Sequence, residues 1–389
     1  ESVTLCGLSL YPQSIGAVPS SAVDLSKVKA VADYSDGSTK EVALLWSAAY
    51  GRISGNIYTV PDIPGAFEVK ASYTELSKSV ENIITVNSAK TVEIPGSYWT
   101  AASAAAGFGP RAGHSTTAFN GALWTIGGIS NNNFKNDIWR SPDGAAWSEI
   151  TTGPLFSPRS LHSALVFNGK LWVIGGYDQS GVKNDVWCSD DGSIWKLIAC
   201  AAEFSPRRGH KCVAHNGSIW LIGGEDGTVL FNDVWNSPDG ISWRRVSPAA
   251  PFIARAYHNA VSFGGKIWIS GGSEAGIRDL WRSSDGENWE LVNGSTPFIQ
   301  TGASLEVMDA KLWAFGGKNN NGVFCSSDGI EWFQAAAATS LEKGMIRRAC
   351  AVFANRLWLT GGYSADGELS AKVWSSLPAS VQPESFGRK

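Results

Sequence analysis

The sequence lacks a long apolar run and an excess of positive charge. No stretch approaches the roughly 18 consecutive apolar residues that a transmembrane helix needs, so we expect no membrane insertion. Charged residues make up 17% of the 389 residues, and the formal net charge is -3. Nucleic acid is not expected as a partner, because it is recognised by clustered positive charge. Strand-like sequence begins directly after Glu1, so we expect that any targeting peptide was removed or never present.

Cysteine and methionine are also scarce, with six and two residues. No Cys-x-x-Cys pair occurs, so the spacing typical of a structural zinc site is missing. An even number of cysteines is by itself weak evidence for disulfides, and free cysteine is among the most often buried residues. We therefore expect free, buried thiols, no metal site and no cofactor.

Glycine and tryptophan, in contrast, are abundant, with 43 and 18 residues. A Gly-Gly pair closes an apolar run six times, in steps of 48, 48, 48, 45 and 45 residues. A period near 50 residues is typical of a repeat architecture, in which no single unit buries its apolar face alone. The pairs, which number repeats one to six, are Gly127-Gly128, Gly175-Gly176, Gly223-Gly224, Gly271-Gly272, Gly316-Gly317 and Gly361-Gly362.

Each repeat predicts four β-strands. In the first four repeats, the first strand follows an Arg-x-x-His motif, and in the first three it ends at an Asn-Gly turn. Asn-Gly between apolar strands is a strong hairpin signal because both residues tolerate positive φ. The second strand ends at the Gly-Gly pair, and the third carries Asn-Asp-x-Trp in repeats one to three. A Ser-x-Asp-Gly turn then leads to a fourth strand with another tryptophan.

The tryptophans recur in three columns, on the second, third and fourth strands. Repeat six lacks the fourth-strand tryptophan. Trp99 precedes the arginine of repeat one by 12 residues, the spacing that each fourth-strand tryptophan has to the next arginine in repeats one to three. We therefore predict that the strand at Trp99 completes the sheet of repeat six and closes a ring of sheets. The indoles are expected to fill the space between neighbouring sheets.

These motifs resemble Kelch repeats, with their Arg-x-x-His start, Trp-x-x-Gly-Gly core and later Asn-Asp-x-Trp. The Ser-x-Asp-Gly turn is similar to the Asp-box of sialidase-type propellers, one residue shorter. The resemblance covers about residues 95–377 and implies a six-bladed β-propeller like the galactose-oxidase-like ones. Repeats five and six depart from the pattern, with Gln300 and Met345 in place of the arginine and Ala303 and Arg348 in place of the histidine.

Residues 1 to about 90 lack the repeat and alternate apolar and polar residues, as half-buried strands do. The strings ADYSDGSTKEV, LLWS and GAFEVKASY resemble bacterial immunoglobulin-like domains, which serve as spacers or adhesive segments outside the cell. The expected all-β organisation is an immunoglobulin-like sandwich over 1–90, a six-bladed Kelch-type propeller over 91–380, and a tail over 381–389. The resemblance implies a bacterial protein that is extracellular or at the cell surface, and we expect a monomer.

Two polar columns precede the first strands, and each has a structural and a functional interpretation. The histidines belong to different repeats without a second ligand column, which favours hydrogen-bonded structural residues over a metal site. The arginines either bind a ligand carboxylate bidentately or bond backbone carbonyls of the next repeat. The arginines are Arg111, Arg159, Arg207 and Arg255, and the histidines are His114, His162, His210 and His258.

The loops that follow the Gly-Gly pairs differ among the repeats, and a scaffold that keeps its core constant varies its binding loops. Tyr177, Glu225, Lys318 and Tyr363 stand first in the loops of repeats two, three, five and six. Such side chains around a shallow mouth suit a sugar or a peptide. With the four arginines they form the candidate ligand site, and ordinary polar loops are the alternative.

The sequence therefore favours a binding or adhesion protein that recognises a glycan or a protein through this loop face, without an assigned catalytic residue. A carbohydrate-active enzyme, similar to propeller mutarotases or sialidases, is one alternative, and a scaffold without a ligand is another. A mutarotase needs an acid/base pair, for which Glu225 with one histidine is the nominee. Two carboxylates about 5–10 Å apart across the mouth would favour an enzyme acting on glycosides.

Overall fold

The computed structural model describes residues 3–17, 22–60, 65–75, 78–88, 99–151, 156–272, 277–296, 302–317, 322–336, 341, 346–364 and 366–376. The main division of the chain into two compact modules lies between Ile94 and Pro95. We call Glu1–Ile94 the N-terminal module and the chain from Pro95 onward the repeat module. No helix in the described part of the chain is long and apolar enough to cross a membrane.

The described residues of the N-terminal module form three small sheets. Alternate residues of β1, β9 and β10 point inward, and Leu10, Val69 and Ile84 among them are fully buried. Since β1 packs on both β9 and β10, an apolar core lies between the first two sheets. The sheets are β1 (Leu5–Tyr11), β4 (Lys29–Tyr34), β5 (Thr39–Glu41); β2 (Ser14–Ala17), β10 (Lys78–Ser88), β9 (Gly65–Glu75), β6 (Leu45–Ala48); and β3 (Ala22–Asp24), β8 (Ile57–Thr59), β7 (Arg52–Ser54), with the 3-10 turn η1 (Leu25–Lys27) after β3.

The repeat module contains six four-stranded antiparallel sheets within the described residues. The sheets of repeats one to three are β12 (Ser115–Phe119), β13 (Ala122–Ser130), β14 (Asn133–Ser141), β15 (Ser148–Glu149); β16 (Ser163–Phe167), β17 (Lys170–Asp178), β18 (Gly181–Ser189), β19 (Trp195–Ala199); and β20 (Lys211–His215), β21 (Ser218–Glu225), β22 (Leu230–Ser237), β23 (Arg244–Ser247). Those of repeats four to six are β24 (Asn259–Phe263), β25 (Lys266–Ser270), β26 (Leu280–Ser283), β27 (Glu290–Asn293); β28 (Ser304–Met308), β29 (Lys311–Phe315), β30 (Val323–Ser326), β31 (Phe333–Ala336); and β32 (Ala349–Phe353), β33 (Arg356–Thr360), β34 (Val373–Ser376), β11 (Trp99–Ser103).

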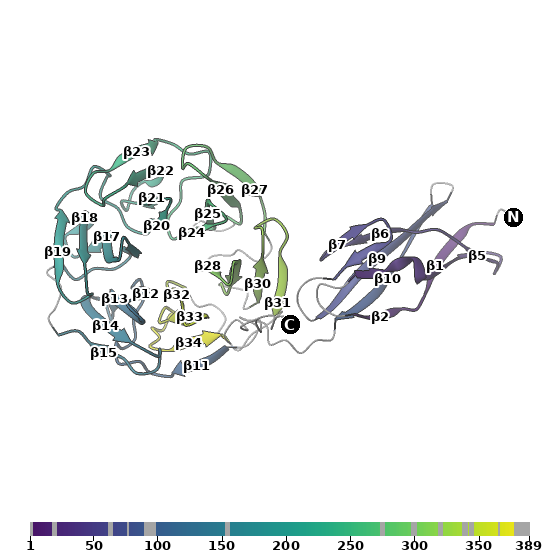
Figure 1. The fold of residues 1–389 in the computed structure, drawn as a ribbon, viewed down its shortest axis with the longest axis horizontal. Helices are drawn as coiled ribbons and strands as arrows, with labels where there is room; N and C mark the ends of the chain where they lie inside the picture. The colour runs from purple at the N-terminus through teal and green to yellow at the C-terminus, as the bar shows by residue number, and fades with distance from the viewer. Residues whose placement is uncertain are drawn as a thin grey trace, which may run out of the picture. The chain divides into compact units, whose positions relative to one another are not determined.

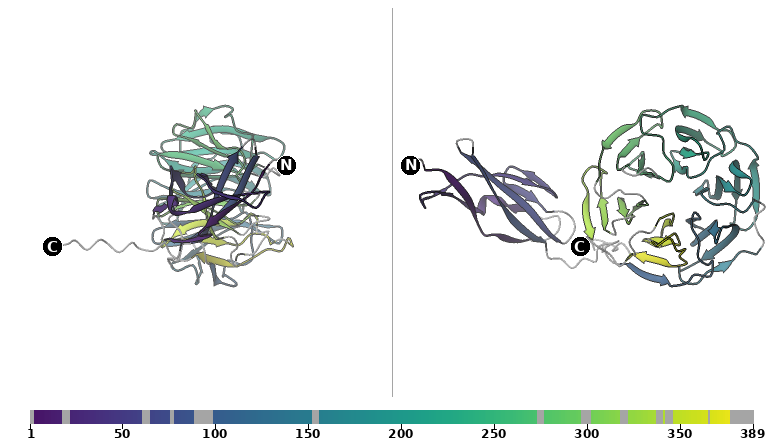
Figure 2. Two further views of the ribbon diagram at one scale, coloured as in Figure 1. Left: turned by 90° about the vertical axis from the view of Figure 1, so that its right-hand side faces the viewer. Right: turned by 180° about the vertical axis from the view of Figure 1, so that it is seen from behind.

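The first strands of the six repeats form a closed circle. Each first strand contacts the next one, in the order β12, β16, β20, β24, β28 and β32. The last strand, β32, also contacts β12, which closes the circle. These strands surround the centre of the ring in Figure 1, and the right-hand view of Figure 2 shows the same ring from behind. The sheet of repeat six has the order β11-β34-β33-β32, so the strand at Trp99 is its outermost strand. This is the pairing that the spacing of Trp99 predicts.

Second-strand tryptophans link neighbouring sheets around the circle. The indole of Trp124 lies so close to Gly192, in the Ser-x-Asp-Gly turn of the next repeat, that a Cβ on this glycine would be 2.4 Å from the ring. The same contact joins repeat six to repeat one, where a Cβ on Gly144 would be 2.0 Å from Trp358. The turn glycine therefore provides space for the indole as well as the positive φ of the turn.

Candidate functional site

The four recurring arginines are buried in the repeat module and are paired within their own repeats. Arg207 binds Asp233 through two bonds, Nη1 to Oδ1 at 2.6 Å and Nη2 to Oδ2 at 2.9 Å. Its Nη1 also donates to the carbonyl of Gly223 at 2.9 Å, and Trp235 Nε1 donates to Asp233 at 2.8 Å. The same pair recurs in the other three repeats as Arg111–Asp137, Arg159–Asp185 and Arg255–Asp279.

This environment leaves the arginines little surface for a ligand. At most 2% of each arginine is exposed, and the guanidinium donors are used inside the repeat. Burial raises the pKa of the Asp137 carboxyl, but the bonds from Arg111 outweigh this effect and hold the pKa below its usual value. The arginines therefore have a structural role, but their partners are an aspartate and a carbonyl of the same repeat and not the predicted carbonyls of the next repeat. We exclude from the candidate ligand site all four arginines, Arg111, Arg159, Arg207 and Arg255.

The four histidines pack against the Gly-Gly pairs. A Cβ on Gly223 would lie 3.0 Å from the ring of His258 and 2.7 Å from the carbonyl oxygen of Arg255, which explains why the position is glycine. Burial lowers the pKa of His114, His162 and His210 to about 3, so these rings are neutral at physiological pH. In the parts of the chain that the structure describes, no three His, Cys, Asp or Glu side chains are placed to hold a metal ion.

Repeats five and six lose both members of the buried ion pair. The residues at the arginine position, Gln300 and Met345, lie outside the described residues. The aspartate position, two residues before the third-strand aromatic, is Gly322 in repeat five and Lys372 in repeat six. Neither repeat therefore keeps an aspartate whose arginine is missing, an arrangement that would leave a buried charge uncompensated.

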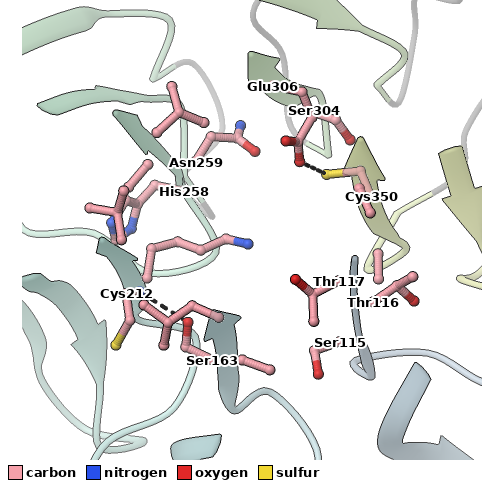
Figure 3. Close-up of a pocket in the computed structure, with 18 of the residues that line it drawn as sticks. Ser115, Thr116, Thr117, Ser163, Cys212, His258, Asn259, Ser304, Glu306 and Cys350 are labelled. Atoms are coloured by element: carbon pink, nitrogen blue, oxygen red, sulfur yellow. Dashed lines mark hydrogen bonds between the residues drawn. The ribbon is translucent and has the colours of Figure 1, made fainter. Parts of the chain in front are cut away.

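The centre of the ring contains a cavity of about 710 Å³, which we call the channel, lined by the first strands of all six repeats. Most of its lining side chains are small, such as Thr117, Ser163 and Ser304 in the close-up of Figure 3. Four charged residues interrupt this pattern, namely Lys211, Glu306, Arg347 and Arg348. Lys211 stands where four of the other repeats have serine or asparagine, and Glu306 stands where repeats three and four have valine.

Glu306 and Cys350 form a polar pair on the channel wall. The thiol of Cys350 donates to Glu306 Oε1 at 2.8 Å, as the dashed line in Figure 3 marks. Burial raises the pKa of the Glu306 carboxyl, although the Cys350 bond and the charge of Lys211 act in the opposite direction. Burial also raises the pKa of the Cys350 thiol. Both groups therefore favour their protonated forms more strongly than they would in water.

One end of the channel is ringed by residues with left-handed backbone. Each directly precedes the histidine or its replacement, and their φ values run from 51° to 77°. Neighbours are linked, since the N–H of Leu161 donates to the carbonyl of Gly113 and the N–H of Tyr257 to that of Gly209, both at 2.7 Å. Large residues in this conformation are strained by about 1–3 kcal/mol each. The ring consists of Gly113, Leu161, Gly209, Tyr257, Gly302 and Arg347.

Five side chains meet beside this ring, and we call them the mouth cluster: Tyr177, Arg208, Glu225, Tyr257 and Arg347. Arg208 Nε donates to Glu225 Oε1 at 2.9 Å, and the hydroxyl of Tyr257 donates to the same oxygen. The guanidinium of Arg208 stacks 4.6 Å from the ring of Tyr177, and that of Arg347 lies 5.2 Å from the ring of Tyr257. Burial, together with the Glu225 bond, raises the pKa of Tyr257 to about 12. The cluster thus offers cations and aromatic faces held in place by one carboxylate.

The structure brings two of the sequence-predicted loop residues together. Tyr177 and Glu225 belong to the mouth cluster, whereas Lys318 lies outside the described residues. Tyr363 is half-buried and pairs through its backbone with Ile346, the residue before Arg347. A pair of Glu225 with a histidine is not assembled, because the histidine rings are buried beside the glycine pairs.

Sequence reasoning missed Arg208, Tyr257 and Arg347. For Tyr257 and Arg347 the signal lay in the residue before the histidine or its replacement, a position at which glycine alternates with leucine, tyrosine and arginine around the six repeats, whereas Arg208 lies one residue earlier. That alternation acquires a meaning only when these residues are known to form one ring.

Comparison with known proteins supports the repeat architecture. Residues 97–272 match the KLHDC2/KLHL20/DRC7 Kelch-repeats domain, and residues 190–380 match the DUF6242 beta propeller domain. Among solved structures, the chain titled "Structure of YjhT" matches with a TM-score of 0.58 at 15% sequence identity, covering 70% of this chain and 96% of that one. No curated protein matches the sequence. At this identity the structural likeness concerns the fold alone.

Proposed function

Because the repeat module is a β-propeller with Kelch repeats, we propose that the protein is a binding protein that recognises a glycan or protein ligand through the propeller face carrying the mouth cluster. The observation that carries the proposal is the convergence of Tyr177, Arg208, Glu225, Tyr257 and Arg347 from repeats two, three, four and six. Residues so far apart in sequence meet only because the first strands form a circle.

The chemistry of the mouth cluster favours a glycan. Half-buried aromatic rings present flat apolar faces, and guanidinium groups donate hydrogen bonds in a fixed plane. Glu225 accepts bonds from both Arg208 and Tyr257 and therefore limits the motion of these two side chains. A rigid site loses less conformational entropy when it binds a flexible, polar ligand.

The proposal includes the architecture around the site. The six four-stranded sheets are six propeller blades, and the N-terminal module is an immunoglobulin-like sandwich that displays the propeller as a spacer. Such a protein is expected to be bacterial, secreted or exposed on the cell surface, and monomeric. The support is the packing of β1 on β9 and β10 around an apolar core together with the resemblance of its strand sequences to bacterial immunoglobulin-like domains.

A carbohydrate-active enzyme receives less support. Glycoside hydrolysis commonly needs two carboxyl groups that flank the scissile bond, and Glu306 is the carboxylate among the described residues that line the channel. Glu225 is bound by Arg208 and Tyr257 and has no histidine partner.

A glycan array probed with the full chain tests the proposal. We expect a defined subset of glycans to bind, and we expect the Tyr177→Ala and Arg347→Ala variants to bind them at least about tenfold more weakly, the loss of one aromatic or cation–π contact. Tyr11→Ala is the matched control, because Tyr11 is an exposed tyrosine in the N-terminal module. Equal binding by the mouth-cluster variants would show that the ligand contacts another surface. If neither the array nor a surface-protein pull-down gives binding at high concentration, the protein is a scaffold.

A further inference from the structure

Three cations line the channel, and two of them lie outside the mouth cluster and have no carboxylate partner among the described residues. Lys211 and Arg348 both line the cavity, and within the described residues neither forms an ion pair. Arg348 Nη2 makes long contacts with the carbonyls of Gly302 at 3.4 Å and Phe315 at 3.3 Å. The Nε atom of Arg348 is buried without a hydrogen-bond partner among the described residues. The recurring arginines, by contrast, are each paired with an aspartate.

These cations replace neutral residues of the repeat. Arg348 occupies the position of the histidines that are neutral in repeats one to three, and Lys211 occupies a position that is serine in three other repeats. Burial lowers the pKa of Arg348 to about 10, which indicates that its charge is poorly compensated by its surroundings. A half-buried, unpaired charge destabilises a fold. Other repeats carry a neutral residue at both positions and so avoid the free-energy cost of an unpaired charge. Packing of the repeat therefore does not explain the two cations.

Glu306 is the carboxylate among the described residues that line the channel. Burial raises the pKa of this carboxyl and favours its neutral form, although the thiol bond that its Oε1 accepts from Cys350 acts in the opposite direction. With Lys211 and Arg348 charged, the inner channel is net positive, although the whole chain has a net charge of -3. Polar groups without charge lie on the same wall, among them Ser304 and Asn259 (Figure 3).

We propose that the channel binds a small molecule with a carboxylate or phosphate group, whose oxyanion is held by Lys211 and Arg348. The cavity volume of about 710 Å³ is within the range typical of small-molecule sites. Arginine donates two parallel bonds to such an oxyanion, and lysine supplies a second positive charge. Ser304 and Asn259 contact uncharged parts of the ligand. This site lies inside the ring and adjoins the mouth cluster, because Tyr257 and Arg347 of the cluster also line the cavity.

The test uses the full chain and three probes, inorganic phosphate, citrate and glucose. Each is titrated by calorimetry at constant ionic strength maintained with sodium chloride. We expect saturable binding of citrate or phosphate and none of glucose, and the stronger of the two anions identifies the ligand as carboxylate or phosphate. Binding of neither anion above the chloride background would overturn the proposal.

The decisive variants restore the residues that other repeats carry. Lys211→Ser and Arg348→His are each expected to weaken anion binding at least tenfold, while the melting temperature of the unliganded protein stays the same or rises. A lower melting temperature with unchanged anion binding would assign the two cations a structural role and refute the site. Glu306→Gln removes the acidic group among the described lining residues and should not weaken binding. Lys196→Ser is the control, because Lys196 is an exposed lysine that pairs with Asp190.

Variants at residues that belong to one site only distinguish the channel proposal from the proposed glycan site. Tyr177→Ala is expected to leave anion binding unchanged, and Lys211→Ser is expected to leave the glycan array unchanged. Anion binding without any glycan signal would refute the function proposed for the mouth and keep the channel site. Simultaneous loss of both ligands in each variant would show one shared site and overturn the separation.

Discussion

Repeats one to four and repeats five and six of the propeller are built on the same four-stranded plan, yet they differ on the side that faces the channel. In the first four, a buried arginine, its aspartate and a neutral histidine recur at fixed positions. In the last two these side chains are replaced as a set, and Glu306, Arg347 and Arg348 appear at or near the channel. The comparison shows that identical polar columns serve the fold, whereas departures from them collect around the channel, where we propose that a ligand binds.

The largest effect is expected from the buried ion pair. Arg207→Gln leaves Asp233, which is 8% exposed, without its cation and should lower the free energy of unfolding by about 3–5 kcal/mol. Urea unfolding measures it. The double variant Arg207→Gln with Asp233→Gly copies the residues of repeat five and should be more stable than the sum of the two single changes implies. If the losses of unfolding free energy in the two single variants simply added up in the double variant, Arg207 and Asp233 would not act as a pair. The contrast between the two groups of repeats would then lose its basis.

Acid should destabilise repeats one to four through their histidines. The folded-state pKa of His210 is lowered to about 3, below the unfolded value of about 6.5. The unfolded chain therefore binds protons that the folded chain does not. Stability is fully present above pH 6.5 and is lost as the pH falls toward 3, by up to about 1.4 kcal/mol per pH unit for each such histidine.

His210→Ala, which copies Ala303 of repeat five, isolates this contribution. The variant should be less stable than the native protein at pH 7, and the difference between the two should shrink by roughly 2–3 kcal/mol at pH 4.5. Thermal melts at both pH values measure the difference. A difference that does not change with pH would mean that this histidine has the same pKa in the folded and unfolded states.

The glycine pairs are expected to respond differently in the two groups of repeats. Gly223→Ala places a Cβ 2.7 Å from a backbone carbonyl oxygen, whereas Gly316→Ala meets the end of the Arg348 side chain, which can rotate away. Both sites have positive φ, so each change introduces strain of about 1–3 kcal/mol, with Gly223 at the upper end. Unfolding in urea should rank Gly223→Ala as more destabilising. The opposite order would show that Arg348 is as rigid as backbone.

The smallest effect is expected at the Ser-x-Asp-Gly turns, where the two groups of repeats should not differ. Asp285 accepts bonds from the backbone N–H groups of Glu287 and Asn288 at 2.9 and 2.8 Å, and Asp328 accepts one from Ile330 at 2.8 Å. Replacing either aspartate by alanine should lower stability by about 1 kcal/mol. A clearly larger effect in repeat four than in repeat five, seen in melting temperature, would extend the difference between the groups to the outer edge of the ring.

Much of the fold follows from sequence spacing. The glycine pairs, the Asn-Gly turns and the tryptophan columns lie at fixed steps, and each predicts a local structure whose physical cause is local. Trp99 shows how far this extends, because one matching interval identified the strand that pairs with β34. The ring of contacts between first strands follows from the same repeat, since each sheet needs a neighbour on both faces.

The candidate site was predicted only in part. Tyr177 and Glu225 were found because they vary between loops, and the arginines were chosen because cations commonly bind carboxylates. The aspartate that holds each arginine is 24 or 26 residues away in sequence, and no spacing rule indicated that the two would meet. Arg208, Tyr257 and Arg347 were missed because they look like single exceptions until the circle brings their repeats together.

Sequence alone determined which segments become strands, where the turns lie, and that the sheets recur with a period near 48 residues. These properties depend on side-chain alternation and on residues close in the chain. Tertiary structure alone decided which charges are neutralised and which remain for a ligand. Arg207 and Arg348 are the same residue type in the sequence. The Nη1 atom of Arg207 lies 2.6 Å from Oδ1 of Asp233, whereas no described carboxylate pairs with Arg348. The strength of a charge depends on the distance to its partner and on its exposure to water, and both are properties of the closed ring.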